Sequence, residues 1–124
     1  MTSDSISDLA GQKYLNVETY RKSGRAVSTP VWFTVEGGRI FVVTRSDTGK
    51  IKRLRNNSNV RFMPCGSRGQ PKGEWRNGTA ALCNAEELEI AVRGRNKKYG
   101  FQAKLTGLLS RSKGDLVAFA ISPA

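Results

Sequence analysis

The following stretch predicts a strand, a turn and a short helix in succession: Arg39-Ile-Phe-Val-Val-Thr-Arg-Ser-Asp-Thr-Gly-Lys-Ile-Lys-Arg-Leu-Arg-Asn-Asn-Ser-Asn-Val60. Residues 39–44 are mostly β-branched or aromatic, as in a strand, and residues 47–49 favour a turn. Residues 50–56 are then typical of a short basic helix. Backbone N–H groups at a helix start are unpaired and carry partial positive charge, so this unit predicts an anion site. Lys50 would add a full charge there, with hydroxyl donors from Thr44, Ser46 and Thr48.

Strand patterns recur on both sides of this unit. The alternation of residue types and the β-branched content predict strands over 15–20, 26–35, 39–44, 59–65, 75–84 and 116–121. Pro30 lies inside the second of these and cannot donate to a sheet ladder, so it marks a bulge or a strand edge. Gly37 and Gly38 predict a tight hairpin turn, because glycine supplies the positive φ that such turns require. Six to seven short strands with few helices favour a mainly β fold, a β-barrel with helical decoration.

Helices are predicted at 7–14, 50–56, 86–99 and 101–109. In the third, acids fill the first turn and Lys97 and Lys98 the last, and Gly100 follows as a stop, which suits the helix dipole and the usual C-terminal glycine. Its apolar stripe is predicted to pack on the sheet through Leu88, Val92 and Tyr99.

The composition narrows the class of protein. With 124 residues the chain is long enough for one domain, 1–124, in which 1–6 is expected to be a flexible tail. It has no apolar run that could span a bilayer and no signal peptide, so we expect a soluble cytoplasmic protein. Absence of histidine excludes Ser-His-Asp and Cys-His nucleophile arrangements and the common zinc sites. Cys65 and Cys83 are expected to be buried packing residues, with a disulfide as the alternative.

The positive charge is concentrated. The formal net charge is +11. Nine Lys or Arg face only two acids between residues 45 and 76, and residues 90–114 hold seven basic residues and no acid. Such a field attracts polyanions: nucleic acid, acidic lipid or a phosphorylated small molecule. The alternative is that much of this charge only keeps the surface solvated.

The motifs together resemble the split-barrel flavin-binding proteins related to pyridoxamine phosphate oxidase, and within them the branch that uses the deazaflavin coenzyme F-420. The resembling residues are Ser28-Thr29-Pro30-Val31-Trp32-Phe33, the Gly37-Gly38 turn, Thr44 with Lys50 and Leu54, Asn57 with Val60 and Arg61, Pro64-Cys65, Gly73-Glu74-Trp75, Gly78-Thr79-Ala80 and Lys98-Tyr99-Gly100. The fold implied is a split β-barrel, and the assembly implied is a homodimer.

The resemblance also implies a cofactor site. The edge of the cofactor ring would lie along Ser28, Thr29, Pro30, Val31 and Trp32, with a proline bulge re-aiming backbone donors. The ribityl chain would be flanked by Val43 and Thr44, and the phosphate would meet Gly49 and Lys50, near Ser46. More distal anionic groups would reach Lys52 or Arg55, and the second subunit would contribute Lys72 and Trp75. As alternatives, Trp32 belongs to the core, Lys50 is a solvated helix residue, and Trp75 only seals a dimer.

The cofactor implied is either F-420 or flavin mononucleotide (FMN). The deazaflavin coenzyme carries a phospholactyl group and an oligoglutamate tail, so a helix with four cations complements it better than it complements FMN. The favoured function is an oxidoreductase that transfers hydride to a small conjugated acceptor, with the hard chemistry supplied by the cofactor. The alternatives are an FMN-dependent oxidoreductase, a heme-type cofactor, a non-catalytic cofactor carrier and a basic nucleic-acid-binding protein. The last is disfavoured because no exposed aromatics interleave with the charge of residues 50–56.

Overall fold

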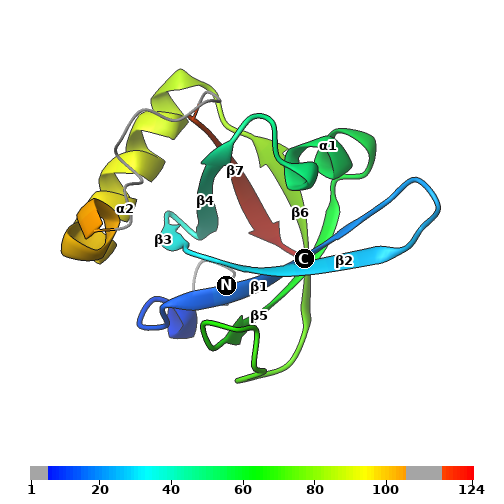
Figure 1. Ribbon diagram of the computed structural model, residues 1–124, viewed down its shortest axis with the longest axis horizontal. Helices are drawn as coiled ribbons and strands as arrows, with labels where there is room; N and C mark the ends of the chain where they lie inside the picture. Colours follow the sequence, from blue (N-terminus) through cyan, green and yellow to red (C-terminus); the bar gives the residue numbers. More distant parts are fainter. Residues whose placement is uncertain (1–5, 106–115) are drawn as a thin grey trace.

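The computed structural model describes residues 6–105 and 116–124, with side chains except those of 101–105. Its main element is one antiparallel seven-stranded sheet in the order β2-β1-β5-β6-β7-β4-β3 (Figure 1). The strands are β1 (Tyr14–Tyr20), β2 (Ala26–Val31), β3 (Thr34–Glu36), β4 (Arg39–Arg45), β5 (Asn59–Cys65), β6 (Arg76–Leu82) and β7 (Leu116–Pro123). The predicted mainly β fold with helical decoration is confirmed.

The connection between β2 and β3 explains why the sheet is curled. These two strands form opposite edges of the sheet, yet only Trp32 and Phe33 separate them in the chain. A link of this length spans on the order of 10 Å, so both edges must come close together. The sheet therefore bends into the split barrel seen in Figure 1.

The predicted strand 26–35 is thus two strands, because the chain crosses from one edge of the sheet to the other within it. Of the two interpretations of Pro30, the strand edge is confirmed and the bulge is wrong. Pro30 pairs with Asn16 in an uninterrupted register that runs from Leu15 with Val31 to Tyr20 with Ala26. An edge strand has one unpaired side, where the missing N–H of proline costs no ladder bond.

Two helices cover the barrel. The shorter, α1 (Gly49–Asn56), starts one residue before the predicted 50–56 and lies against β1. The longer, α2 (Ala85–Leu105), packs on the outer side of β4 and β7 (Figure 1). Within α2, Gly100 has a non-helical conformation (φ 8°, ψ −87°) that separates two helical pieces, so the predicted stop at Gly100 and the start of a second piece after it are confirmed. Positions 106–109 of the second piece lie outside the described residues.

The N-terminal prediction is corrected in part. A 3-10 turn covers only Ser7–Leu9, and β1 already begins at Tyr14, so the predicted helix 7–14 is too long. Ile6, assigned to the expected tail, is fully buried, and 1–5 lie outside the described residues. Burial of Ile6 and Leu9 in the core ties this segment to the barrel.

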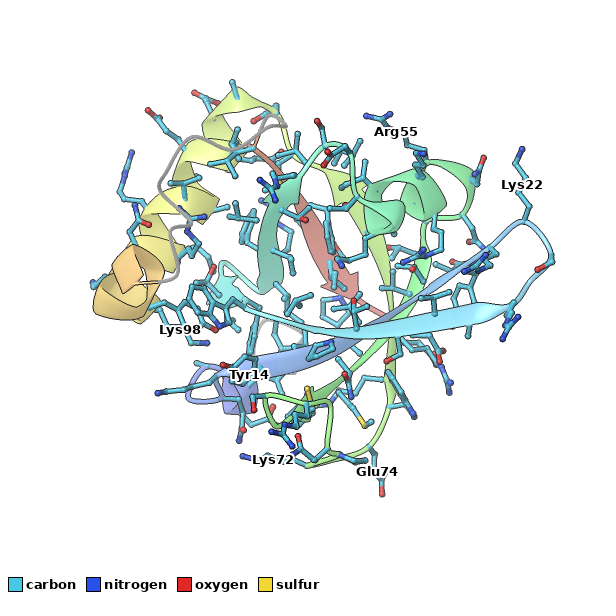
Figure 2. The ribbon with its side chains drawn as sticks, viewed as in Figure 1. Tyr14, Lys22, Arg55, Lys72, Glu74 and Lys98 are labelled. Carbon is cyan, nitrogen blue, oxygen red and sulfur yellow. The ribbon has the colours of Figure 1, made fainter. Side chains whose placement is uncertain are left out.

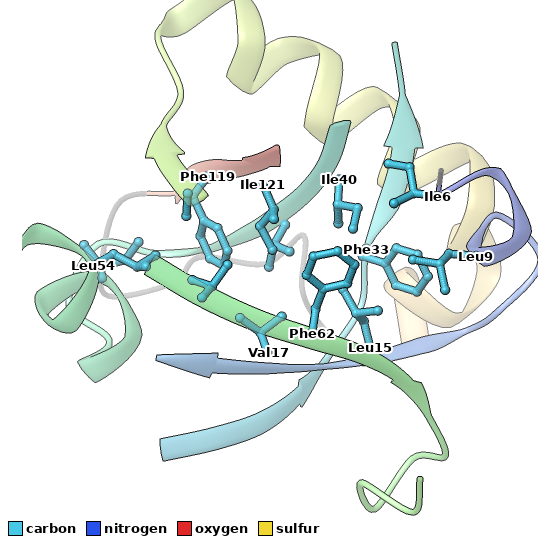
Figure 3. Close-up of a cluster of buried hydrophobic side chains, with 14 residues drawn as sticks. Ile6, Leu9, Leu15, Val17, Phe33, Ile40, Leu54, Phe62, Phe119 and Ile121 are labelled. Carbon is cyan, nitrogen blue, oxygen red and sulfur yellow. The ribbon is translucent and has the colours of Figure 1, made fainter. Parts of the chain in front are cut away.

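The core fills the barrel between the curled strands and α1. Figure 3 shows its large side chains, which include Phe33, Phe62 and Phe119. Ile51 and Leu54 of α1 complete this cluster, so the apolar side of α1 closes one part of the barrel and leaves the basic side outward. A second cluster beneath α2 contains Phe41, Ala91, Ala118 and Ala120, and Leu88 packs on it. The predicted contact between the apolar stripe of α2 and the sheet is confirmed at Leu88. Cys65 and Cys83 are both free thiols, as the packing interpretation requires.

We expect the Gly78→Ala variant to lose about 1–3 kcal/mol of unfolding free energy, since overpacking a tight interior costs this much. A Cβ at Gly78 would lie 2.8 Å from the Ser122 carbonyl oxygen and 2.9 Å from Cγ2 of Ile121, and the first of these is backbone that cannot rotate away. Denaturant unfolding measures the loss. Gly11→Ala is the matched control, because no atom lies within 4 Å of its added Cβ. Equal midpoints for both variants would contradict the prediction.

Candidate functional site: a basic corner at the start of α1

The start of α1 is fixed by a threonine cap. The Thr48 hydroxyl accepts a hydrogen bond from the Ile51 N–H (3.4 Å) and donates one to the Arg45 carbonyl oxygen (3.1 Å). This cap uses the Thr48 hydroxyl, which was predicted from the sequence to donate a hydrogen bond to an anion. The predicted strand–turn–helix unit is confirmed, and Gly49 at the start of α1 is exposed.

Lys50 reaches from the first turn of α1 across to the edge strand β2. Its Nζ donates a hydrogen bond to the Thr29 hydroxyl at 3.2 Å. The side chain is half-buried, and burial, followed by the charge of Arg53, lowers the pKa of Lys50. The structure therefore brings together two residues predicted for the cofactor site that are 21 positions apart in sequence.

Arg53 lies one helical turn after Lys50 and points the same way. Its Nε donates a 2.6 Å hydrogen bond to the hydroxyl of Thr19, which is fully buried on β1. Its guanidinium folds back over the helix start, where a Cβ at Gly49 would lie 2.8 Å from a terminal guanidinium nitrogen. Glycine at this position leaves room for the cation beside the unpaired N–H groups.

Arg21, just after β1, completes a group of three cations. Burial and then the charge of Arg21 lower the pKa of Arg53. None of the ion pairs found among residues 6–100 and 116–124 includes Arg21, Lys50 or Arg53. Like charges held together without a carboxylate raise the local potential and attract an anion. We call these three residues, with the hydroxyls of Thr19 and Thr29, the basic corner.

The other residues predicted on β2 do not all turn their side chains to the basic corner. Alternation along the strand leaves Ser28 and Pro30 exposed, whereas Thr29 and Val31 are half-buried and Val31 packs on the core. On β4, Val43 packs against the cluster beneath α2, and Thr44 is half-buried beside Val117 of β7. Of the remaining α1 and turn residues, Ser46 is half-buried, and Lys52 and Arg55 are exposed.

Trp32 lies at the crossing between β2 and β3 and contacts α2. Its ring stacks on Tyr99 with a centroid distance of 4.3 Å and an interplanar angle of 2°. The Tyr99 hydroxyl donates to the Lys13 carbonyl oxygen (2.7 Å) and accepts from the Phe33 N–H (3.1 Å). Tyr99 therefore supplies hydrogen bonds to the backbone at the point where the chain leaves β2 and the pairing of β2 with β1 ends.

Lys72 and Trp75 lie on another side of the molecule. Figure 2 shows Lys72 opposite Arg55. The loop that carries it folds along the outer face of β1 and β5, where Asn16 donates a hydrogen bond to the Gly69 carbonyl oxygen (3.0 Å). The Trp75 ring lies 4.8 Å from the Arg61 guanidinium. Within one chain, the structure does not bring this pair to the basic corner.

The site residues predicted from the sequence did not include Arg21, Arg53 or Thr19. Arg53 follows Lys50 by three positions, and this helical spacing was a usable signal. Arg21 and Thr19 had none, since only the antiparallel pairing of β1 with β2 and the packing of α1 on β1 bring them there.

A curled antiparallel barrel in which the chain crosses from one sheet edge to the other at Trp32 and Phe33 has the split-barrel fold. The model of the family described as pyridoxamine 5'-phosphate oxidase matches residues 5–124. The chain therefore belongs to this family.

Solved structures agree with this fold. The chain is similar to the heme storage protein HutZ of Vibrio cholerae (17% identity, TM-score 0.73, covering 99% of this chain and 90% of that one). It is similar to general stress protein 26 of Bacillus anthracis (23%, 0.67, 98% and 88%) and to an F-420 reductase (14%, 0.64, 96% and 92%). At these identities the likeness shows the fold alone.

No curated protein matches the chain significantly. Among the described residues, no helix is both long and apolar enough to cross a membrane.

Proposed function

We propose that this protein is an oxidoreductase that binds the deazaflavin coenzyme F-420 and serves hydride transfer to a small conjugated acceptor. The observation that carries the proposal is the contact of Lys50 with Thr29 inside a group of cations that lacks a carboxylate. Membership of a family whose proteins bind flavin-type cofactors supports it.

The basic corner fits the phosphate of such a cofactor. Lys50 and Arg53 supply full charges, and the first N–H groups of α1 supply directed donors. Thr29 and Thr19 hold the two cations in place through their hydroxyl oxygens. When bound, the cofactor would supply the hydride chemistry, so the chain needs only to position it and to exclude water. This agrees with a sequence that has no histidine.

The distribution of charge favours F-420 over FMN. Beyond the basic corner, exposed Lys52 and Arg55 continue along α1, and exposed Lys22 and Arg25 lie in the β1–β2 hairpin. One phosphate cannot use so many cations, whereas a tail with several carboxylates can. Each exposed pair contributes about 1 kcal/mol or less, but several together can shift affinity by roughly a hundredfold.

Heme binding is the second candidate, favoured by the similarity to a heme storage protein. The chain offers no histidine as an axial ligand. The carboxylates of a heme could bind at the basic corner, but the heme iron would then need a tyrosine or a cysteine as its axial ligand. We therefore rank heme below the deazaflavin.

We propose that the active unit is a homodimer. Lys72 and Trp75 lie away from the basic corner of their own chain, so they can line the same cofactor only if a second copy supplies them. Proteins of this family are commonly dimers. Sedimentation of the protein with and without cofactor measures the assembly.

Titration of the three cofactors into one preparation tests the proposal. We expect F-420 to bind with quenched fluorescence and more tightly than FMN, and heme to bind weakly or without a defined Soret shift. Tighter binding of FMN would overturn the choice of deazaflavin. If none of the three cofactors binds, and the protein instead binds a random DNA duplex in a salt-sensitive manner, a nucleic-acid-binding protein would be favoured.

A further inference from the structure

A hollow of about 290 Å³ lies between the edge strand β3 and helix α2. A hollow of this size is close to the lower end of ligand pockets and admits a small organic molecule. Figure 2 shows that Lys98, one of its lining residues, lies far from Arg55 of α1, so the hollow is separate from the basic corner. The walls of the hollow are formed by Thr34, Val35 and Glu36 of β3, by Gly94, Lys97 and Lys98 of α2, and by Ala10.

Lys98 supplies a cation in the α2 wall. Its Nζ donates a hydrogen bond to the Phe33 carbonyl oxygen at 3.0 Å, and it lies 3.9 Å from the ring centroid of Phe33 and 5.3 Å from that of Tyr99. The carbonyl oxygen and the two rings all stabilise an ammonium group. Burial lowers the pKa of Lys98 to about 8, so the ammonium form still predominates at pH 6.5.

This ammonium group has donors left for a ligand. It carries three N–H donors, and the Phe33 carbonyl oxygen accepts one of them. No ion pair found among the described side chains includes Lys98. The positive charge at the hollow therefore lacks a carboxylate of its own.

The β3 wall supplies a directed backbone donor, the Val35 N–H. The 37–38 turn (φ 58° and 78°) is flanked by the pair Glu36 and Arg39, and the pair that closes such a two-residue turn is hydrogen-bonded. Because hydrogen-bonded and non-hydrogen-bonded pairs alternate along an antiparallel ladder, the next pair, Val35 with Ile40, exchanges no ladder bonds. The Val35 N–H and carbonyl groups therefore point to the other edge of β3.

That edge of β3 is open toward the hollow. β3 is the last strand of the sheet, and among the described residues no backbone hydrogen bond outside the strand pairing uses Val35. The Val35 side chain packs against the core, so its backbone is what borders the hollow. On the opposite wall, an added Cβ at Gly94 would lie 3.3 Å from the Thr34 hydroxyl oxygen, so glycine at this position leaves the space open.

We propose that this hollow binds a small carboxylic acid. One carboxylate oxygen accepts a hydrogen bond from the Lys98 ammonium group and the other accepts one from the Val35 N–H. The apolar part of the ligand lies against Ala10 and Gly94. This inference goes beyond the proposed function and is independent of the cofactor at the basic corner.

The charges around the hollow favour a carboxylate over a phosphate. Lys97 and Lys98 bring two positive charges, and Glu36 brings one negative charge. The excess of one positive charge matches a monoanion, whereas the second charge of a phosphate would face the Glu36 carboxylate without compensation. One ammonium group and one N–H also match the two oxygens of a carboxylate.

Titration of the full chain, labelled with ¹⁵N, with sodium benzoate at pH 6.5 tests the proposal. A hydrogen bond from the Val35 N–H to the carboxylate moves the amide proton resonance of Val35 downfield, so this resonance reports directly on the site. We expect a saturable downfield shift with a dissociation constant of about 1 mM, a usual value for a fragment of this size. Benzamide has the same shape without the charge, and we expect it to bind at least tenfold more weakly.

Two variants separate the Lys98 charge from the general charge of α2. We expect Lys98→Gln to weaken benzoate binding at least tenfold. Arg93→Gln is the matched control, because Arg93 is 76% exposed and does not line the hollow. We expect this control to change benzoate binding by less than about twofold.

Three results would overturn the inference. The first is a Val35 amide resonance that does not move with benzoate up to about 20 mM, or that moves equally with benzamide; both are measured on the unaltered chain and depend on no variant folding. The second is equal weakening by Lys98→Gln and Arg93→Gln. The third is a Val35 shift that saturates at lower concentration with inorganic phosphate than with benzoate. Cofactor titration at the basic corner is unaffected by these results, so failure here leaves the proposed function standing.

Discussion

The Lys50→Ala variant is expected to bind F-420 at least tenfold more weakly, a loss of about 1.4 kcal/mol of binding free energy. Lys50 supplies a half-buried cation at the helix start, in contact with Thr29 of the edge strand. The folded protein should lose little, because burial and the charge of Arg53 both disfavour the Lys50 ammonium in the free protein. Fluorescence titration measures the affinity and a thermal melt measures the stability.

Arg93→Ala is the matched control for the loss of one positive charge. Its side chain is 76% exposed on α2 and makes only a long contact of 3.8 Å with Glu89. We expect its cofactor affinity to change by less than about twofold at moderate salt, because exposed distant charges are screened. A dissociation constant that is unaltered by Lys50→Ala, or altered equally by Arg93→Ala, would show that the basic corner does not hold the cofactor.

Truncation of Tyr99 is expected to have the largest effect on stability. Tyr99→Phe should cost about 1–3 kcal/mol, since the buried Phe33 N–H and the Lys13 carbonyl oxygen both lose a partner. Tyr99→Ala should cost about 3–5 kcal/mol, because it also removes the stack with Trp32 and leaves a cavity. These are large fractions of the total stability of a domain, which is about 5–15 kcal/mol.

Denaturant unfolding of both variants separates the hydroxyl from the ring. Tyr14→Phe is the control: Tyr14 is half-buried, and its hydroxyl makes no hydrogen bond with the residues that the structure describes. We expect this control to change stability by less than about 0.5 kcal/mol. If Tyr99→Phe unfolds at the same midpoint as the control, the hydroxyl does not hold the crossing between β2 and β3. If both Tyr99 variants unfold alike, the stack adds nothing.

The sequence predicted best where a pattern is local and repeated. The strand 59–65 is found at its predicted bounds, and α1 begins one residue early, because alternation and turn chemistry act over a few neighbouring residues. Lys50 at the start of α1 also followed from local signals. The anion site there stays a prediction, since no measurement yet places a cofactor in it.

Long-range contacts overrode local signals elsewhere. Residues 26–35 have strand propensity throughout, yet the chain changes from one sheet edge to the other at Trp32 and Phe33, and Tyr99 holds it there. Lys98 has the position of a dipole-stabilising lysine, and instead its amine binds the Phe33 carbonyl oxygen.

By itself, the sequence determined the positions of most strands and the basic start of α1, since short-range periodicity and turn chemistry encode these directly, and its motifs indicated the family. Only the tertiary structure decided which cations stand together. Lys50 meets Thr29, and Arg53 meets Thr19, across 21 and 34 positions of sequence. The curl of the sheet creates these contacts, because it sets the helix start against the edge of the barrel, and no local pattern records that curl.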